Sequence, residues 1–241
     1  MLLNFTCDNF KSFRDGFQFN MVPEKRMTEL HYSIISEEVA RKKEKALSAS
    51  VIYGPNAAGK SSIVNAMSCM RQIVLRGNIR DAADDRTGDH VSNSLMLAPF
   101  AFRDDAAPVR FDVTFTLEGL KYQYIFSAFL GNFLEKSSPR YIDREELFVN
   151  DTQIYKRTKD AVDALDLNSI VEYLNVSFEL KETEKIRKIM SDNMTADSLL
   201  LVTDFNSFCS KKLVADIQRW FENQFIIVNS SYRIRFYPYM T

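Results

Sequence analysis

Residues 54–62, with the sequence GPNAAGKSS, have the types and the spacing of a phosphate-binding loop. They meet the pattern GxxxxGK followed by serine or threonine in full, from Gly54 through Gly59 and Lys60 to Ser61. Glycine lets the backbone turn tightly, so that successive N–H groups point at one anion. The lysine of such a loop contacts the terminal phosphates, and the serine that follows it holds Mg²⁺. These residues predict a site for a nucleoside triphosphate, ATP, with Ser61 as the ligand of Mg²⁺.

The other loop residues contribute backbone groups and one more hydroxyl. Ser62 is expected to donate to the α-phosphate. The complete set of loop residues predicted to bind the nucleotide is Gly54, Pro55, Asn56, Ala57, Ala58, Gly59, Lys60, Ser61 and Ser62. A glycine-rich turn with a surface lysine is the alternative, but a chance match to the full pattern has odds of roughly one in a hundred at average residue usage.

Two elements must position this loop. The apolar residues 51–53 predict a short strand before it. After the loop, apolar residues recur at three- and four-residue spacing, which predicts an amphipathic helix. They are Ile63, Ala66, Met67, Met70 and Val74. Gly77 is predicted to end this helix, because glycine readily adopts the left-handed conformation of a C-terminal cap. The order strand, loop, helix places the positive end of the helix dipole at the phosphates.

The residues before the loop predict a hairpin and a connector. Residues 2–7 and 17–21 are aliphatic and aromatic and are separated by a polar turn, so they predict a pair of strands. Residues 23–45 are strongly charged and are predicted to connect this pair to the loop, in part as a helix. The basic run VARKKEK within them is predicted to be a solvated helix face, with a phosphate-contacting patch as the alternative.

The residues after the loop change character twice. Residues 109–117 alternate apolar and polar side chains, and Glu118 and Gly119 predict a turn into a second aromatic-rich strand. Beyond residue 156 the spacing becomes helical, and one long buried face is predicted. Its members are Leu201, Phe205, Phe208, Leu213, Ile217 and Trp220.

Together these segments predict one domain over residues 1–241. It comprises strands, loop and helix in 1–76, a flexible loop in 77–99, an antiparallel β region in 100–155, a helical region in 156–224 and a terminal strand and tail in 225–241. His31 and His90 are expected at the surface of loops.

Composition excludes several classes of protein. The chain has 241 residues, 46% of them hydrophobic, and a formal charge of −1, so no global field draws it to nucleic acid or to an anionic membrane. No run approaches the roughly 20 apolar residues of a membrane span. The three cysteines are odd in number and widely spaced, which predicts neither disulfides nor a zinc site. We expect a cytoplasmic protein in a reducing compartment.

Four segments carry a resemblance to a known family. The opening NFTCDNFKSF, the loop VIYGPNAAGKSSIVNAM, the segment FDVTFTLEGLKYQYIF and the later REELF resemble the N-terminal part of an ABC-type ATPase. The group includes the OLD-like and abortive-infection AAA proteins and is related more distantly to RecF and SMC heads. The resemblance implies an α/β P-loop NTPase fold, as the N-terminal half of an ABC-type head with a mixed sheet, an antiparallel β region and C-terminal helices.

The same resemblance implies roles for residues outside the loop. It implies that the first strands present Lys11 and Ser12 near the nucleotide, so that Lys11 approaches the phosphates. The alternative for Lys11 is an ordinary exposed charge. It also implies that Gln123 corresponds to the glutamine that senses Mg²⁺ and the attacking water, although Gln123 lies inside a strand-like pattern.

The chain also departs from the family pattern. A serine-rich signature motif, an apolar strand ending in Asp-Glu and a switch histidine are not recognisable. The nearest candidate for the acidic strand is residues 199–204, but Phe205 stands where a glutamate should follow, and the helical spacing predicts a core helix instead. We therefore expect the N-terminal half of a larger ATPase head, which binds nucleotide and needs a second half or a homodimer partner for hydrolysis.

Three functions are consistent with these residues. The first is an ATP-binding module in bacterial antiphage defence, in which nucleotide binding controls dimerisation and an effector such as a nuclease. The second is a RecF-like DNA-binding head, in which the basic runs ARKKEK and KETEKIRK contact the phosphate backbone. The third is a small-molecule kinase that uses NIRDAADDRTGD as a lid. A regulatory module without turnover is a further alternative to the first.

Overall fold

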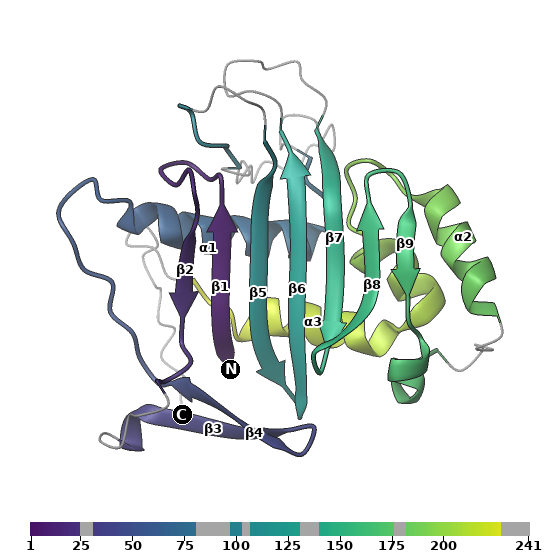
Figure 1. The fold of residues 1–241 in the computed structure, drawn as a ribbon, viewed down its shortest axis with the longest axis horizontal. Coiled ribbons are helices and arrows are strands. Elements are labelled where there is room, and N and C mark those ends of the chain that lie inside the picture. The colour runs from purple at the N-terminus through teal and green to yellow at the C-terminus, as the bar shows by residue number, and fades with distance from the viewer. Residues whose placement is uncertain (25–30, 81–96, 103–106, 131–139, 176–181, 228–241) are drawn as a thin grey trace, which may run out of the picture.

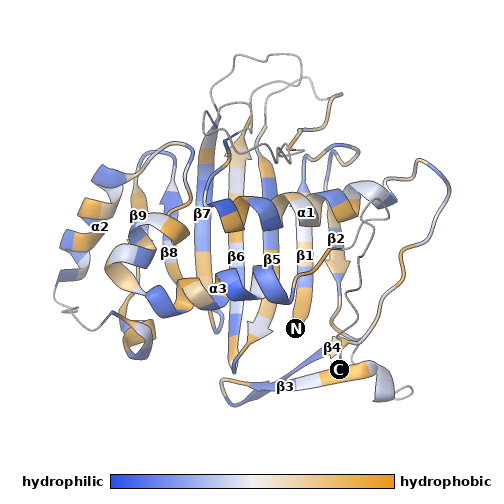
Figure 2. Ribbon diagram, turned by 180° about the vertical axis from the view of Figure 1, so that it is seen from behind, coloured by the Kyte–Doolittle hydropathy of each residue, from blue (hydrophilic) through white to orange (hydrophobic). Residues whose placement is uncertain are grey.

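The computed structural model describes residues 1–24, 31–80, 97–102, 107–130, 140–175 and 182–227. Within them, one seven-stranded sheet in the order β2-β1-β5-β6-β7-β8-β9 carries helices on one face (Figures 1 and 2). Helices α1 and α3 both cross this face, which is turned to the viewer in Figure 2. A separate two-stranded ribbon, β3-β4, lies below the strand ends in Figure 1.

The bounds of the elements follow the chain. The strands of the large sheet are β1 (Leu2–Asp8), β2 (Phe17–Asn20), β5 (Val109–Leu117), β6 (Leu120–Phe129), β7 (Tyr141–Val149), β8 (Thr152–Thr158) and β9 (Val162–Leu165). The ribbon consists of β3 (Ile34–Val39) and β4 (Lys42–Leu47). The α-helices are α1 (Lys60–Arg76), α2 (Thr183–Asn193) and α3 (Lys211–Asn223), with 3₁₀-helices at His31–Ser33 and Asn168–Tyr173 and a π-helix, η5, at Leu201–Cys209.

Every pair of neighbouring strands in the described part of the chain is antiparallel. The prediction of a mixed sheet is therefore wrong for this part of the chain. The turn at Glu118 and Gly119 and the turn at Asn150 and Asp151 show the reason, since two residues can join only antiparallel strands. The predicted strand pairs at the N-terminus and in the aromatic region are confirmed.

The core lies between the sheet and the helices. On β5 the predicted alternation is confirmed, because Val109, Phe111, Val113, Phe115 and Leu117 are all buried. Phe115 stacks on Trp220 of α3 with ring centroids 3.9 Å apart. The buried residues of α1 meet the same core, among them Ala66 and Met70.

The connector before the loop differs from its prediction. Residues 34–47 form the ribbon β3-β4 rather than part of a helix. Ala40 and Arg41 form its turn with positive φ angles of 47° and 66°, the mirror-type turn whose twist suits antiparallel strands. Val39 and Ala46 are buried, so packing against the body of the protein outweighs the helix propensity of the charged run.

The C-terminal part is less helical than predicted. Residues 156–165 continue the sheet as the end of β8 and as β9. The long helical face is interrupted at Ser210, whose backbone is extended and whose hydroxyl accepts the Leu213 N–H at 3.2 Å as the N-terminal cap of α3. Serine favours this position because its oxygen satisfies an otherwise unpaired helix amide. The core-helix prediction for residues 199–204 is confirmed from Leu201 onward, where the π-helix η5 begins.

Two predicted strands are absent from the described residues. Residues 51–53 form no strand, and Val51 and Tyr53 are 80% and 90% exposed. A strand exists only where a neighbour supplies ladder hydrogen bonds, and no described strand pairs with these residues. Residues 225–227 form no strand either, and the rest of the predicted terminal strand lies outside the described residues.

The loop predicted at 77–99 is fixed at its start. Ile79 is fully buried, and its N–H donates to the Asp197 carbonyl at 2.9 Å. Residues 81–96, with His90, lie outside the described residues, and so does the side chain of His31. Among the described helices, none combines the length and the hydropathy that crossing a membrane would need.

Candidate functional site

The last three residues of the phosphate loop, 60–62, form the first turn of α1. Gly59 precedes the helix in the left-handed conformation, with φ of 87°, and provides no side chain to cap it. The N–H groups of Gly59, Lys60 and Ser61 have no acceptor among the described residues, and the first turn of α1 contains no acidic residue. The positive end of this helix is thus left without a compensating protein group, as an anion-binding helix start requires.

Lys60 is turned back over the loop. Its ammonium donates to the carbonyl oxygens of Gly54 at 2.8 Å and of Pro55 at 2.6 Å. An ammonium has three N–H donors, so these two bonds fix the side chain and leave one donor for a phosphate oxygen. Residues 54–58 are exposed, and so is Ser61, whose hydroxyl is accessible to a metal ion beside them.

The turn between β1 and β2 packs against this loop. The hydroxyls of Ser12 and Ser62 lie 2.9 Å apart, at hydrogen-bond distance. The ring of Phe13 lies 3.1 Å from the position that a Cβ on Gly59 would occupy. Two segments about 50 residues apart in the sequence therefore meet at the start of α1. The proximity of Ser12 to a bound nucleotide stays a prediction. The sequence analysis did not predict that Phe13 lies against Gly59, although Phe13 belongs to the same NFKSF segment as Lys11 and Ser12.

Lys11 lies in the same turn, with φ of 47°. Its ammonium is 5.4 Å from the centroid of the Phe10 ring. Burial lowers the pKa of this ammonium, with an opposing contribution from the Cys69 thiol of α1. A desolvated cation beside the loop gains more from a nearby anion than a solvated one does. The approach of Lys11 to the phosphates stays a prediction that this placement favours.

Gln123 is not brought to the loop. Its neighbours on β6 point to the helix-covered face, where the Tyr122 hydroxyl bonds Asp216 of α3 at 3.2 Å. Successive strand residues alternate between faces, so Gln123 points to the opposite face. There its amide donates to both carboxylate oxygens of Asp112 at 3.0 and 3.2 Å. Burial raises the pKa of Asp112, with Gln123 opposing this shift. The water-sensing role of Gln123 stays a prediction.

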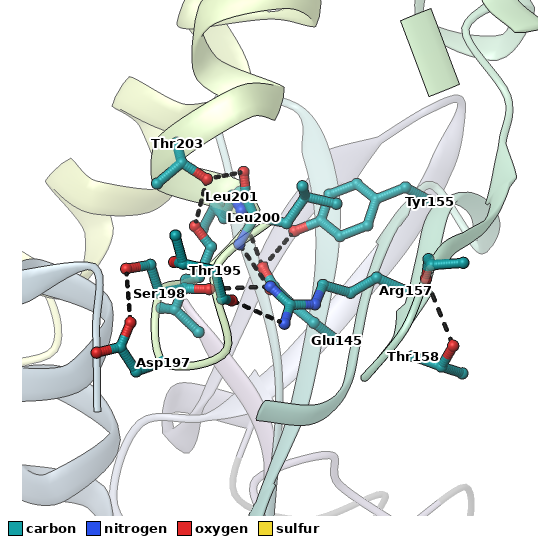
Figure 3. Close-up of polar contacts among 12 residues, drawn as sticks. Glu145, Tyr155, Arg157, Thr158, Thr195, Asp197, Ser198, Leu200, Leu201 and Thr203 are labelled. Atoms are coloured by element: carbon teal, nitrogen blue, oxygen red, sulfur yellow. Dashed lines mark hydrogen bonds and ion pairs between the residues drawn. The ribbon is translucent and has the colours of Figure 1, made fainter. Parts of the chain in front are cut away.

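Glu145, in the REELF segment, is fully buried and accepts four hydrogen bonds (Figure 3). Its carboxylate accepts the Tyr124 hydroxyl at 2.9 Å and the Tyr155 hydroxyl at 2.8 Å. It also accepts the N–H groups of Leu200 at 2.7 Å and Leu201 at 2.9 Å, where η5 begins. A carboxylate at a helix start compensates the positive end of the helix dipole. Glu145 therefore ties strand β7 to the C-terminal helices.

Arg157 completes this cluster. It is 1% exposed, lies 3.8 Å from the Glu145 carboxylate, and donates to the Ser198 carbonyl at 2.9 Å. Burial raises the pKa of both Tyr124 and Tyr155, and the negative charge of Glu145 raises it further. The cluster lies inside the core, so its contacts indicate a structural role. Among the described residues, no group of His, Cys, Asp and Glu side chains is placed to hold a metal ion.

Comparison with known proteins gives one result that bears on this site. Residues 49–189, more than half of the chain, match a family model described as "AAA domain, putative AbiEii toxin, Type IV TA system". The match begins just before the phosphate loop and includes α1 and strands β5 to β9. No curated protein matches the chain.

Proposed function

The chain belongs to this family of AAA domains, described as a putative AbiEii toxin of a type IV toxin–antitoxin system, and on that premise we propose that it binds ATP with Mg²⁺ in residues 54–62. Membership makes it a nucleotide-binding ATPase module of the P-loop class. The proposal adds the identity of the nucleotide, the metal and the residues that hold them.

The start of α1 carries this proposal. Its first amides have no acceptor among the described residues, and the Lys60 side chain is held by two carbonyl groups of the loop. Glycine is required at position 59 because its φ is positive and a Cβ there would lie 3.1 Å from the Phe13 ring. The Ser61 hydroxyl would hold Mg²⁺, which would supply positive charge to the phosphates of the nucleotide. The residues present fit a magnesium nucleotide.

Calorimetric titration with ATP, in Mg²⁺ and in EDTA, tests the proposal. We expect tighter binding in Mg²⁺, and we expect Ser61→Ala to remove most of that difference. Ser68→Ala, two turns further along the same helix, is the matched control and should behave as wild type. Equal affinity with and without Mg²⁺ would count against a metal at Ser61, and no heat of binding at millimolar ATP would overturn the proposal.

We also propose that a second ATPase half or a homodimer partner completes the site. The support is the exposed apolar segment before the loop, where Val51, Ile52 and Tyr53 are 80%, 39% and 90% exposed. Three consecutive apolar residues are suited to a strand, and a partner strand would bury them and satisfy their backbone groups. Light scattering with and without ATP tests this. A monomer in both conditions, together with no retained partner after native purification, would contradict it.

The biological setting that we propose is antiphage defence, with nucleotide binding controlling dimerisation and an effector. The description of the family as a putative abortive-infection toxin supports this. Expression of the natural locus in a phage-sensitive host tests it. We expect fewer phage plaques with the wild-type locus than with Lys60→Ala, and equal plaque numbers would contradict the proposal.

A further inference from the structure

Two of the three acidic side chains of the ribbon β3-β4, Glu37 and Glu44, contact the body of the protein, and the third, Glu38, is exposed. Glu37 accepts from the Thr116 hydroxyl at the end of β5 and forms an ion pair with the N-terminal ammonium at 4.0 Å. Glu44 forms an ion pair with Lys121 of β6 at 3.5 Å. Both acids therefore face the body of the protein, on the same side as the buried Val39. This side anchors the ribbon to the large sheet.

The basic side chains lie on the exposed part of the ribbon. Arg41, Lys42, Lys43 and Lys45, here called the cationic ribbon, are all exposed. None of them forms an ion pair with a carboxylate among the described residues. Because strand residues alternate between faces, Lys43 and Lys45 share the outward face, and Glu44 between them points inward. The ribbon precedes residue 49, outside the part of the chain that matches the family.

The second basic run of the chain is arranged differently. On α2, Lys185 pairs with Glu182 at 3.3 Å and Arg187 pairs with Glu184 at 2.9 Å. Because carboxylates of the same helix neutralise these cations, they attract an external anion less strongly than unpaired cations do. The two basic runs look alike in the sequence, but in the structure they differ in whether their cations form ion pairs with carboxylates.

We propose that the cationic ribbon binds the phosphate backbone of duplex DNA. Lys43 and Lys45 are two residues apart on one strand, roughly 6.8 Å. Each DNA strand carries one phosphate per roughly 3.4 Å of helix axis, so two cations at this separation can each contact a different phosphate. A two-stranded ribbon also fits the width of the major groove. Single strands are bound on aromatic platforms, and residues 34–47 contain no aromatic side chain.

An anionic membrane is the main competing partner for a cationic surface. Membrane-surface segments combine basic residues with apolar side chains that enter the lipid. The outward face of the ribbon holds Ser36 and Glu38 opposite Lys45 and Lys43, so its centre is polar. This composition favours a charged polymer whose phosphates lie at its surface.

Fluorescence anisotropy with a labelled 20-base-pair duplex tests the proposal on the full chain. We expect the double variant Lys43→Gln/Lys45→Gln to bind about tenfold more weakly at low salt. Its affinity should also depend less on salt, with the slope of log K against log salt smaller by roughly 1.8 for two lost phosphate contacts. Glu38→Gln removes an acid opposite Lys43 and should raise the affinity about twofold.

Lys185→Gln/Lys188→Gln on α2 is the matched control, since it removes the same charge from an exposed helix. It should bind the duplex as wild type does. Circular dichroism of each variant checks that the fold is kept. The proposal is overturned if the wild type does not bind the duplex, if both double variants lose affinity equally, or if the chain sediments with phosphatidylserine vesicles but not with DNA. Nucleotide binding is not required for the duplex contact, so Lys60→Ala should leave it intact.

Discussion

At the scale of single residues, the start of α1 depends on one glycine and one lysine. Gly59 has a left-handed backbone, and a Cβ at this position would lie 3.1 Å from the Phe13 ring. The Lys60 ammonium is held by the Gly54 and Pro55 carbonyl groups of the loop. Each residue contributes something that the other cannot, the first a conformation and the second a charge.

Lys60→Ala should weaken ATP binding by an order of magnitude or more. The change removes a charge-assisted phosphate contact, which contributes about 1.5–3 kcal/mol. Calorimetric titration measures the loss. Lys185→Ala removes an exposed lysine of α2 and serves as the control, and an unchanged affinity of the Lys60 variant would refute the role of the loop.

Gly59→Ala should lower both ATP affinity and stability. A left-handed backbone costs an L-residue about 1–2 kcal/mol, and the new Cβ would lie 3.1 Å from Phe13. Ala57 has φ of 65°, so Ala57→Gly is the control in the same loop and should stay within about 1 kcal/mol of wild type. Urea denaturation compares the two. If both variants are equally stable, the conformation of Gly59 is not what positions the loop.

At the scale of elements, the sheet and the C-terminal helices are joined through Glu145. Its carboxylate accepts two tyrosine hydroxyls and two amides at the start of η5. The charge is fully buried beside Arg157, so the cost of desolvation is offset only while all partners are present. The cluster fixes which face of β7 the helices cover.

Glu145→Gln should destabilise the fold by about 3–5 kcal/mol, because Arg157 would remain buried without its carboxylate. Adding Arg157→Met should restore part of the loss. Glu184→Gln removes one exposed ion pair of α2 and should change the free energy of unfolding by less than about 1 kcal/mol. Chemical denaturation measures the free energy of unfolding of all three variants. If Glu145→Gln loses less than about 1 kcal/mol, the Glu145 cluster does not stabilise the fold.

At the scale of the whole molecule, one continuous apolar core lies between the sheet and the helices. The core also encloses groups that ionise at high pH. Burial raises the pKa of the Cys69 and Cys209 thiols to about 12, and it raises the pKa of Tyr124 and Tyr155. All three cysteines are free and buried.

The free energy of unfolding should therefore fall as the pH rises. The folded state keeps these protons, while the unfolded chain releases them near pH ~8.5 for cysteine and ~10 for tyrosine. Their contribution is complete below those values and is lost progressively above them. Urea denaturation between pH 7.5 and 11 should show a decline that begins near 8.5, and Cys69→Ala should make its first part shallower. A constant free energy over this range would contradict the prediction.

The sequence alone determined the features that depend on neighbouring residues. The phosphate loop, the extent of α1 with its Gly77 cap, the alternation of β5 and its turn into β6 all follow from local spacing. These features were predictable because each one is stabilised mainly by backbone conformation and by side chains a few positions apart.

The tertiary structure decided what depends on distant partners. It made residues 34–47 a ribbon, left residues 51–53 exposed, and placed Gln123 on the face opposite α3. It also gave Glu145 its partners Leu200 and Leu201 at the start of η5, 55 and 56 residues away. Strand pairing and the choice of a covered face are set by contacts between segments far apart in the chain, and the local pattern of a charged or apolar run does not contain them.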